Sequence, residues 1–505
     1  MSLPPSQHYD AVVIGAGHNG LILATYLQRA GYRTLLVERD ASIGGMTCTH
    51  EPMSAGFRHS PHANFLAYQA VTPIMQDLQL RARGLATFEP DIQHGIAFAD
   101  ARPPVLVHRV GHEEGSLRSF ARHSARDAAT YVDLRKRAAT LTPAIRDVLF
   151  HPLSSAGIGV HRAAMAQAFG ELAEDARLGT RSAAQFIDER FESPEIRTLL
   201  YLLAMEFGAS LTQAGDDLAF LGFVLWMIGS RQVPIGGMQS FADALHRAAL
   251  AEGVQITTSA EVGSIRIEAG RVKGIVIAGR FIEAPIVASS IGVERTLLDL
   301  PSGGGLGASD RQALAAYRRG SGSTIASQAF ALTEAPRYRS ARWDADLDRC
   351  VQTFIGFDSP ESVLLHEREL AMGLLPSPRA SMRVPSLFDP SLAPAGFHVA
   401  GADSHFPDEK ALSEEDWQGI AESYNEALLD VWSRAAPNMT RDTVIASHFA
   451  IPRSGDRRVL LREGRQYSTS IAGLYLCGTS TYPGGGVHGA CAINAFQEIT
   501  GVQFQ

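Results

Sequence analysis

The stretch 9–40, YDAVVIGAGHNGLILATYLQRAGYRTLLVERD, constrains the fold more than any other part of the chain. A short apolar run at 12–14 leads directly into GAGHNG, which has the spacing GxGxxG, and leucines at helical spacing follow. The next apolar run, TLLVE, ends in Glu38. This order predicts a βαβ unit that binds a dinucleotide: a strand, a glycine turn, a helix and a second strand that ends in an acid.

Each glycine of this unit has its own physical role. Gly15 permits the tight turn, Gly17 lets a pyrophosphate approach the backbone, and Gly20 lets the helix pack closely against the strand. Free N–H groups at the start of the helix stabilise phosphate charge. Glu38 is placed to accept hydrogen bonds from the adenosine ribose. The motif alone does not choose between FAD and NAD, so the choice depends on the residues that follow.

Three separated stretches form an ordered set. Gly44 and Gly45 follow the second strand, as in flavin-binding proteins, within DASIGGMTCTHEP. A second stretch, 233–300, begins VPIGGMQSFADALHRAALAEGVQITTSAEVGS, and a third, 473–496, reads GLYLCGTSTYPGGGVHGACAINAF. With this set the chain resembles the phytoene-desaturase-like flavoproteins, within the larger amine-oxidase-type group. The resemblance implies that the cofactor is FAD.

The resemblance also implies a fold class and a domain order. We expect a mixed α/β fold, in which a Rossmann-like FAD-binding domain is assembled from the segments 1–100, 231–300 and 456–505. A substrate domain is inserted between them, mainly helical over 101–230 and of mixed sheet and helices over 301–455. In the family this domain forms an apolar tunnel. YLLAMEF and LAFLGFVLWMI are candidates for lining it, although apolar helical stripes more often face a core.

The three glycines 484–486 stand ahead of a predicted helix, far in sequence from the first glycine loop. In relatives the final strand and helix return to the nucleotide-binding domain. The resemblance therefore implies that the strand ends at Gly478 and that the flavin ring lies against bare backbone near Gly486. The positive end of the following helix then favours negative charge on the reduced ring. A glycine turn before an ordinary surface helix is the plain alternative.

The resemblance extends to single residues. Val262 is expected to pair its backbone with the adenine. Met46 stands where amine oxidases usually carry an arginine, which argues against a close amine-oxidase relationship and leaves backbone amides to hold the phosphates. The predicted FAD contacts are Gly15, Ala16, Gly17, Asn19, Gly20, Glu38, Arg39, Gly44, Gly45, Met46, Val262, Gly478, Gly486 and Val487.

Three residues are candidates for catalysis. His62 takes the place of a glycine that relatives commonly carry beside the flavin, and His488 precedes the final helix. An imidazole titrates near neutrality, so either ring can take a proton as hydride leaves. Tyr482 is expected to flank the flavin ring. Packing roles are the alternative for all three, because the chain has 17 histidines.

Composition excludes several other classes. The net charge is −8 without a long run of one sign, which argues against nucleic acid and anionic lipid as partners. The four cysteines form no CxxC pair, and DADLDRC and LHEREL are incomplete as calcium and zinc motifs, so we predict no metal. The start lacks a leader, and no apolar run reaches the roughly 20 residues of a spanning helix. We expect a cytoplasmic protein and leave peripheral membrane contact and oligomeric state open.

The leading functional prediction is an FAD-dependent dehydrogenase or desaturase of a hydrophobic small molecule, reoxidised by quinone or dioxygen. An oxidase of a C–N bond and a flavin-dependent polyene isomerase are the enzymatic alternatives. A non-enzymatic alternative is a lipid-binding protein of the Rab GDP-dissociation-inhibitor type. The intact set of Gly15, Gly17, Gly20 and Glu38 argues against that last class, because a protein without flavin need not keep it.

Overall fold

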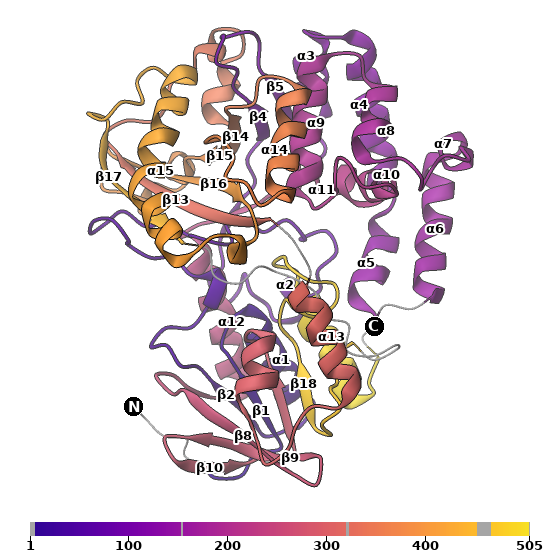
Figure 1. Cartoon of the computed structure of the whole chain (residues 1–505), viewed down its shortest axis with the longest axis vertical. Helices are drawn as coiled ribbons and strands as arrows, with labels where there is room; N and C mark the ends of the chain where they lie inside the picture. The colour runs from indigo at the N-terminus through magenta and orange to yellow at the C-terminus, as the bar shows by residue number, and fades with distance from the viewer. Residues whose placement is uncertain (1–5, 153–154, 320–322, 452–465, 504–505) are drawn as a thin grey trace.

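A five-stranded parallel sheet forms the centre of one end of the molecule in the computed structural model, which describes residues 6–152, 155–319, 323–451 and 466–503. Its strands come from three distant parts of the chain (Figure 1). In spatial order they are β18 (Leu474–Leu476), β11 (Ile286–Ser289), β1 (Ala11–Ile14), β2 (Thr34–Val37) and β7 (Gln255–Thr257). The prediction of a mixed α/β fold with a Rossmann-like sheet built from separate segments is confirmed.

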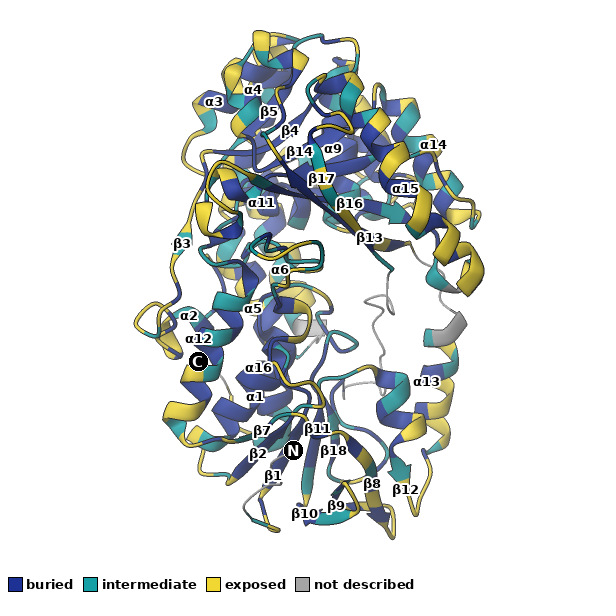
Figure 2. Cartoon of the chain, turned by 90° about the vertical axis from the view of Figure 1, so that its left-hand side faces the viewer, coloured by how far each residue is buried: buried dark blue, intermediate teal, exposed yellow. Residues whose placement is uncertain are grey.

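Helices and a second sheet cover this parallel sheet on both faces. On one face, α1 (His18–Arg29) packs between α12 (Met238–Glu252) and α16 (Ala490–Thr500). On the other face, a sheet in the order β10-β9-β8-β12 buries its isoleucines against β1 and β2. Figure 2 shows the parallel strands and α1 almost wholly buried between these layers. The strands of the second sheet are β8 (Val262–Glu268), β9 (Arg271–Ile277), β10 (Arg280–Glu283) and β12 (Pro301–Ser302).

A seven-stranded sheet forms the other end of the molecule, in the order β17-β13-β16-β15-β14-β4-β5. The long helix α15 (Glu414–Ala435) packs on one of its faces, and α9 (Pro194–Glu206) and α14 (Pro360–Ala371) lie toward its opposite side (Figure 1). Its strands are β4 (Ile92–Ile96), β5 (Val105–His108), β13 (Thr324–Leu332), β14 (Gln352–Ile355), β15 (Ala380–Arg383), β16 (His398–Phe406) and β17 (Val444–Ala450).

Two elements lie apart from the segment to which the sequence assigned them. Strand β4 belongs to the predicted FAD-binding segment 1–100, yet it pairs with β14 and β5 in the seven-stranded sheet. Helix α13 (Ala308–Arg319) belongs to the predicted substrate segment 301–455, yet its Leu314 packs in the same core cluster as the isoleucines of β8. Both differences arise because pairing and packing partners are distant in sequence, where composition and periodicity carry no signal.

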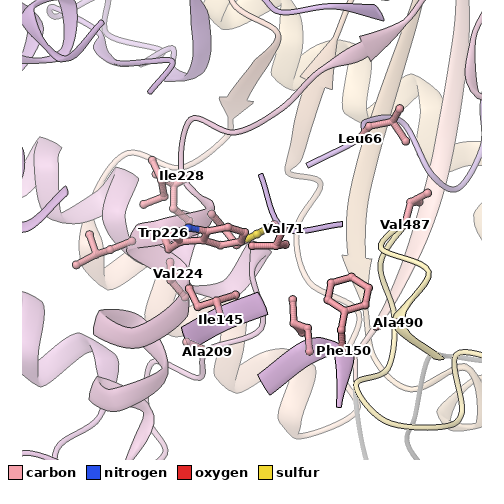
Figure 3. Packing of buried hydrophobic residues seen from close by; sticks show 14 of the residues in the cluster. Leu66, Val71, Ile145, Phe150, Ala209, Val224, Trp226, Ile228, Val487 and Ala490 are labelled. Atoms are coloured by element: carbon pink, nitrogen blue, oxygen red, sulfur yellow. The ribbon is translucent and has the colours of Figure 1, made fainter. Parts of the chain in front are cut away.

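The segment 101–230 is mainly helical after β5. Its longest apolar stretches are core: Leu199, Leu203 and Phe220 are fully buried in one continuous hydrophobic cluster. Figure 3 shows that Phe150 of this segment lies beside Val487 and Ala490 of the C-terminal segment. Its helices are α3 (Glu113–Ala121), α4 (Ala125–Ala139), α5 (Thr142–Phe150), α6 (Ser155–Phe169), α7 (Glu171–Glu174), α8 (Ala183–Arg190), α9, α10 (Asp216–Ala219) and α11 (Leu225–Met227).

No helix among the described residues is both long and apolar enough to cross a membrane. Within the same residues, no group of three or more histidine, cysteine or acidic side chains is arranged to hold a metal ion. The structure describes all four cysteines, Cys48, Cys350, Cys477 and Cys491; each is buried, and no two of them form a disulfide bond.

Candidate functional site

The first glycine loop joins the buried strand β1 to helix α1. Gly15 has φ +94°, and a Cβ there would lie 2.7 Å from Ile291 and from Ser290 Oγ. A Cβ on Gly20 would lie 1.9 Å from the carbonyl oxygen of Gly15. Packing within the protein therefore requires glycine at both positions, as the sequence predicted.

Gly17 is different, because the protein leaves it room. The nearest atom to a Cβ built on Gly17 is the Gly44 oxygen at 4.0 Å, and its φ of −68° suits any residue. It is also the N-cap of α1 and supplies no side-chain hydrogen bond to the helix start. A bare backbone facing open space at a helix N-terminus is the surface that a pyrophosphate requires.

The second glycine pair lies against the first loop. Gly44 N–H donates to the Ala16 carbonyl over 2.9 Å, and a Cβ on Gly45 would lie 3.2 Å from the Cα of Gly17. Both residues have positive φ values, +119° and +54°. The segment 44–46 thus borders the open space at Gly17, and the side chain of Met46 is 44% exposed there.

Glu38 stands at the end of β2, beside the loop. Its Oε2 accepts the Ala16 N–H over 2.7 Å, and its Oε1 accepts the Asp40 N–H over 3.0 Å. The backbone carbonyl of Glu38 accepts the N–H of Ala260, two residues before Val262 at the start of β8. Glu38 and Val262 therefore lie close together, where the sequence analysis placed the adenosine. Arg39 instead points to solvent beside Asp40.

Two polar side chains of the first loop are buried and incompletely satisfied. His18 is 7% exposed and Asn19 is 4% exposed. His18 Nε2 and Asn19 Oδ1 have no hydrogen-bond partner in the part of the chain that the structure describes. The pKa of His18 is lowered to about 4. Burial is the larger cause, and a hydrogen bond with the backbone of Gly486 opposes it. Buried polar atoms without partners at an open cradle indicate the place of a ligand.

The C-terminal segment closes on the same place. Cys477 N–H donates to the Ser289 carbonyl over 2.8 Å, and a Cβ on Gly478 would lie 2.6 Å from the Ser290 oxygen. Gly484 and Gly486 have φ values of +106° and +120°. The final helix does not begin directly after Gly486, because its N-cap is Gly489 and α16 starts at Ala490.

The sequence analysis missed two residues that build this site. The Ser290 hydroxyl donates to the carbonyl oxygens of Gly15 and Ile14, with Oγ–O distances of 2.9 and 3.1 Å. These contacts fix the first loop against the end of β11. His18 occupies a variable position of GxGxxG and meets the last glycine loop. In the structure Ser290 directly follows β11, and a polar residue at the end of an apolar run was the one available signal.

Tyr482 and His488 engage the backbone. Tyr482 Oη donates to the Val148 carbonyl of α5 over 2.7 Å. His488 Nδ1 accepts the Ala490 N–H over 3.0 Å, so its Nε2 carries the hydrogen and donates to the Gly485 carbonyl, 3.3 Å away. These contacts give both side chains a part in holding the last glycine loop.

His62 is exposed on the loop 58–65. The N–H of Ala63, next to it, donates to the Met46 carbonyl over 3.2 Å, so this loop borders the glycine cradle. On its other side the loop meets the seven-stranded sheet: His59 Nε2 lies 3.2 Å from Ser327 Oγ, and Asn64 Nδ2 lies 3.4 Å from Asp403 Oδ2. The loop thus joins the two ends of the molecule.

Buried ion pairs lie where this loop meets the sheet. Arg383 binds Asp403 through two contacts of 2.5 and 2.8 Å and is 4% exposed. Arg231 pairs with Glu206 at 2.9 Å, and its guanidinium lies 4.5 Å from the centre of the Phe65 ring. The sequence did not predict these pairs, because their partners are distant in the chain.

A parallel sheet with glycine loops from both ends of the chain closing on one open backbone defines a dinucleotide-binding protein. The sequence profile of the flavin containing amine oxidoreductases matches residues 20–492, and the chain belongs to this family. FAD is its cofactor, and the glycine loops, Glu38 and the unpartnered atoms of His18 and Asn19 fit that cofactor.

Curated relatives share sequence with the whole chain at low identity. Pyridine nucleotide-disulfide oxidoreductase domain-containing protein 2 of Rattus norvegicus is 27% identical, covering 96% of this chain and 92% of the relative. One of the subunits of limonene dehydrogenase from Castellaniella defragrans is 26% identical, covering 97% of this chain and 94% of the relative. The neurosporene-forming phytoene desaturase of Cereibacter sphaeroides is 25% identical over about half of each chain, 50% and 51%.

Solved structures share the fold. An oxidoreductase from Methanosarcina mazei superposes with a TM-score of 0.63 at 17% identity, covering 97% of this chain and all of the other. A putrescine oxidase bound to putrescine superposes with a TM-score of 0.55 at 15% identity, covering 98% of each chain. The resemblance to phytoene-desaturase-like proteins within the amine-oxidase-type group is confirmed.

Proposed function

We propose that the chain is a flavin-dependent dehydrogenase that forms a carbon–carbon double bond in a hydrophobic small molecule. The observation that carries the proposal is the open backbone at Gly17. The glycine pair at 44–45 borders it, and the neighbouring His18 contacts the C-terminal glycine loop at Gly486. FAD, when bound, supplies the acceptor for the hydride. The names of two relatives, a limonene dehydrogenase and a phytoene desaturase, support desaturation as the reaction.

The residues of the chain bind, orient and accept a proton. The N-terminus of α1 and the backbone at Gly17 and Gly45 hold the phosphates, and Glu38 holds the ribose. His62, exposed on the loop beside Met46, accepts the proton that the substrate loses from the neighbouring carbon. The electrons then pass to a quinone or to dioxygen.

Oxidation of an amine is the second candidate, because solved neighbours include a putrescine oxidase and a cyclohexylamine oxidase. An amine substrate is a cation, and nearby carboxylates stabilise its charge. A cavity beside the loop 58–65 carries Arg58 and Arg383, and none of the described residues that line it is acidic. This charge pattern favours a substrate without an ammonium group.

Absorbance of the purified protein tests the proposal first, because bound flavin gives it a yellow colour. Anaerobic mixing with terpenes and polyenes should then bleach the flavin, and the product should be lighter by two hydrogens. Bleaching by amines with release of peroxide would support the C–N oxidase instead. A product with the same mass as the substrate would support the isomerase. Protein that stays colourless and takes up no FAD would overturn all three in favour of a lipid-binding protein.

Location and partners are proposals of the same kind. We propose a cytoplasmic protein that binds no nucleic acid, consistent with its net charge of −8. Peripheral contact with a membrane, from which an oily substrate would be taken, is compatible with this location. Fractionation of cells that produce the chain would distinguish a free from a membrane-associated protein.

A further inference from the structure

The two faces of the seven-stranded sheet differ in polarity. Successive side chains of a strand point to opposite faces of the sheet. In β13, β15 and β16 the pairing aligns neighbouring strands so that the odd-numbered residues share one face and the even-numbered residues share the other. One face carries Ser327, Ser381, Arg383, Asp403 and His405, whereas the other carries Ala380, Met382, Ala402 and Phe406, which pack in the core with α15. The polar face is turned toward the loop 58–65.

This loop docks on the polar face with little space between them. A Cβ on Gly401 would lie 2.8 Å from His59 Cε1 and 3.1 Å from Arg383 Nε. Gly401 therefore allows His59 and Arg383 to meet over the sheet. The paired residues hold each other in place, since His59 contacts Ser327 and Arg383 is bound through both terminal nitrogens to Asp403.

A cavity of about 30 Å³ opens between the loop, the sheet and the start of α12. It has room for two or three water molecules, or for a group of about three heavy atoms. Its walls include the apolar Phe65, Met238, Phe388 and Leu392. Its polar end is formed by His59, Asn64, Arg58 and Arg383. The cavity is therefore amphipathic.

The polar end offers mainly hydrogen-bond donors. Arg58 and Arg383 carry guanidinium groups, which only donate. Asp403 offsets the charge of Arg383 from outside the cavity, since it is not among the lining residues. The pKa of His59 is lowered well below its ordinary value, mainly by burial and then by the positive charge of the nearby Arg383. Its ring is therefore neutral. A group that accepts hydrogen bonds is the complement of this set.

We propose that this cavity binds a carbonyl or carboxylate oxygen of the substrate, and that the substrate is an oxygen-bearing hydrophobic molecule rather than a plain hydrocarbon. The inference rests on the proposed dehydrogenase function and names its substrate class. The guanidinium groups donate hydrogen bonds to the oxygen. Only the oxygen-bearing group of about three heavy atoms enters the cavity, and the carbon skeleton extends out of it. Loop 58–65 contributes residues to this cavity and also carries His62, whose neighbour Ala63 donates to the Met46 carbonyl at the cofactor cradle.

The test compares three ligands with one carbon skeleton on the holoprotein: a cyclic terpene hydrocarbon, its ketone and its carboxylate. Binding is followed by the change in flavin absorbance, and turnover by anaerobic bleaching. The oxygenated ligand should bind about tenfold tighter than the hydrocarbon, the effect of one hydrogen bond to a charged donor. A preference for the ketone or for the carboxylate identifies which oxygen the cavity takes.

Two variants connect the preference to the cavity. Two changes remove a guanidinium donor: Arg58→Gln, and Arg383→Gln combined with Asp403→Asn. Each should bring the oxygenated ligand to within about threefold of the hydrocarbon. The paired substitution removes both charges while keeping a hydrogen-bonded pair, so no buried charge is left alone. Asn425→Leu, on α15 behind the sheet, is the control and should keep the full preference.

Equal binding of all three ligands would overturn the inference, and so would a preference for the oxygenated ligand that both cavity variants retain. If any of the three ligands still bleached the flavin, the proposed dehydrogenase function would stand. Absence of bleaching by every ligand, with tight and selective binding of the oxygenated one, would instead overturn the proposed reaction and support the cavity assignment.

Discussion

The ring of His18, in the first glycine loop, hydrogen-bonds the backbone of Gly486, in the last. The remaining ring nitrogen, Nε2, is buried and has no partner among the described residues. We therefore expect it to hydrogen-bond FAD. His18→Phe should weaken FAD binding to the apoprotein about threefold to tenfold, the effect of one hydrogen bond. Titration of the apoprotein with FAD, followed by flavin fluorescence, measures this change, and His151→Phe on the surface is the control.

Acid should destabilise the apoprotein partly through the same ring. Burial lowers the pKa of His18 from 6.5 to about 4 in the folded chain. Between these values the unfolded chain binds the proton more readily, so stability is complete above about pH 6.5 and falls as the pH approaches 4. At pH 5 the wild type should have lost about 2 kcal/mol more than His18→Phe. Urea unfolding of both proteins at pH 7.5 and pH 5 provides the comparison, and equal losses would contradict the burial of a neutral ring.

Gly17 and Gly20 should respond differently to the same substitution. Gly17→Ala places a methyl group in open space at an ordinary φ of −68°, so the apoprotein should keep its unfolding free energy within about 0.5 kcal/mol. The methyl group then occupies the phosphate position, and FAD binding should fall by at least about 100-fold. Gly20→Ala forces a Cβ to 1.9 Å from the Gly15 oxygen and should prevent folding. Thermal unfolding and FAD titration together separate the two cases.

The local part of the site could be predicted from the sequence. GAGHNG, the acid at Glu38 and the pair at Gly44 occur within short stretches. The tight turn at Gly15 and the positive φ values at Gly44 and Gly45 are local requirements of the backbone. The return of the C-terminal segment was predicted through the resemblance alone. Its details differ, because His488 and Gly489 form the turn before α16 and delay the start of the helix.

The polar contacts between the two ends of the molecule could not be predicted. Arg383 and Asp403 sit on neighbouring strands, and Arg383 meets His59 from a loop more than three hundred residues earlier in the chain. Nothing in the composition of β15 or β16 indicates which partner a buried arginine finds. Apolar periodicity did predict that the stretch 218–230 is buried, but it did not distinguish a core helix from the wall of a tunnel.

Glu38 should affect both the cofactor and the loop. Its Oε2 holds the Ala16 N–H at 2.7 Å, so Glu38→Ala removes a hydrogen bond from the glycine loop as well as the contact to the ribose. FAD binding should weaken by about 100-fold in Glu38→Ala and by about tenfold in Glu38→Gln, which keeps one oxygen acceptor. Flavin content after gel filtration and FAD titration give both values. Unchanged flavin content in Glu38→Ala would contradict the assignment of the ribose contact.

His62 and Tyr482 should separate proton transfer from positioning. His62 is exposed beside the cradle, so His62→Ala should lower turnover by about 100-fold and remove the fall in rate at acidic pH. Tyr482 donates to the Val148 carbonyl, so Tyr482→Phe should lower the unfolding free energy by about 1 kcal/mol and leave the shape of that profile unchanged. His50→Ala, another exposed histidine, is the control for His62. Full turnover in His62→Ala, with an unaltered pH profile, would show that solvent takes the proton, because no side-chain base would then be needed in contact with the substrate.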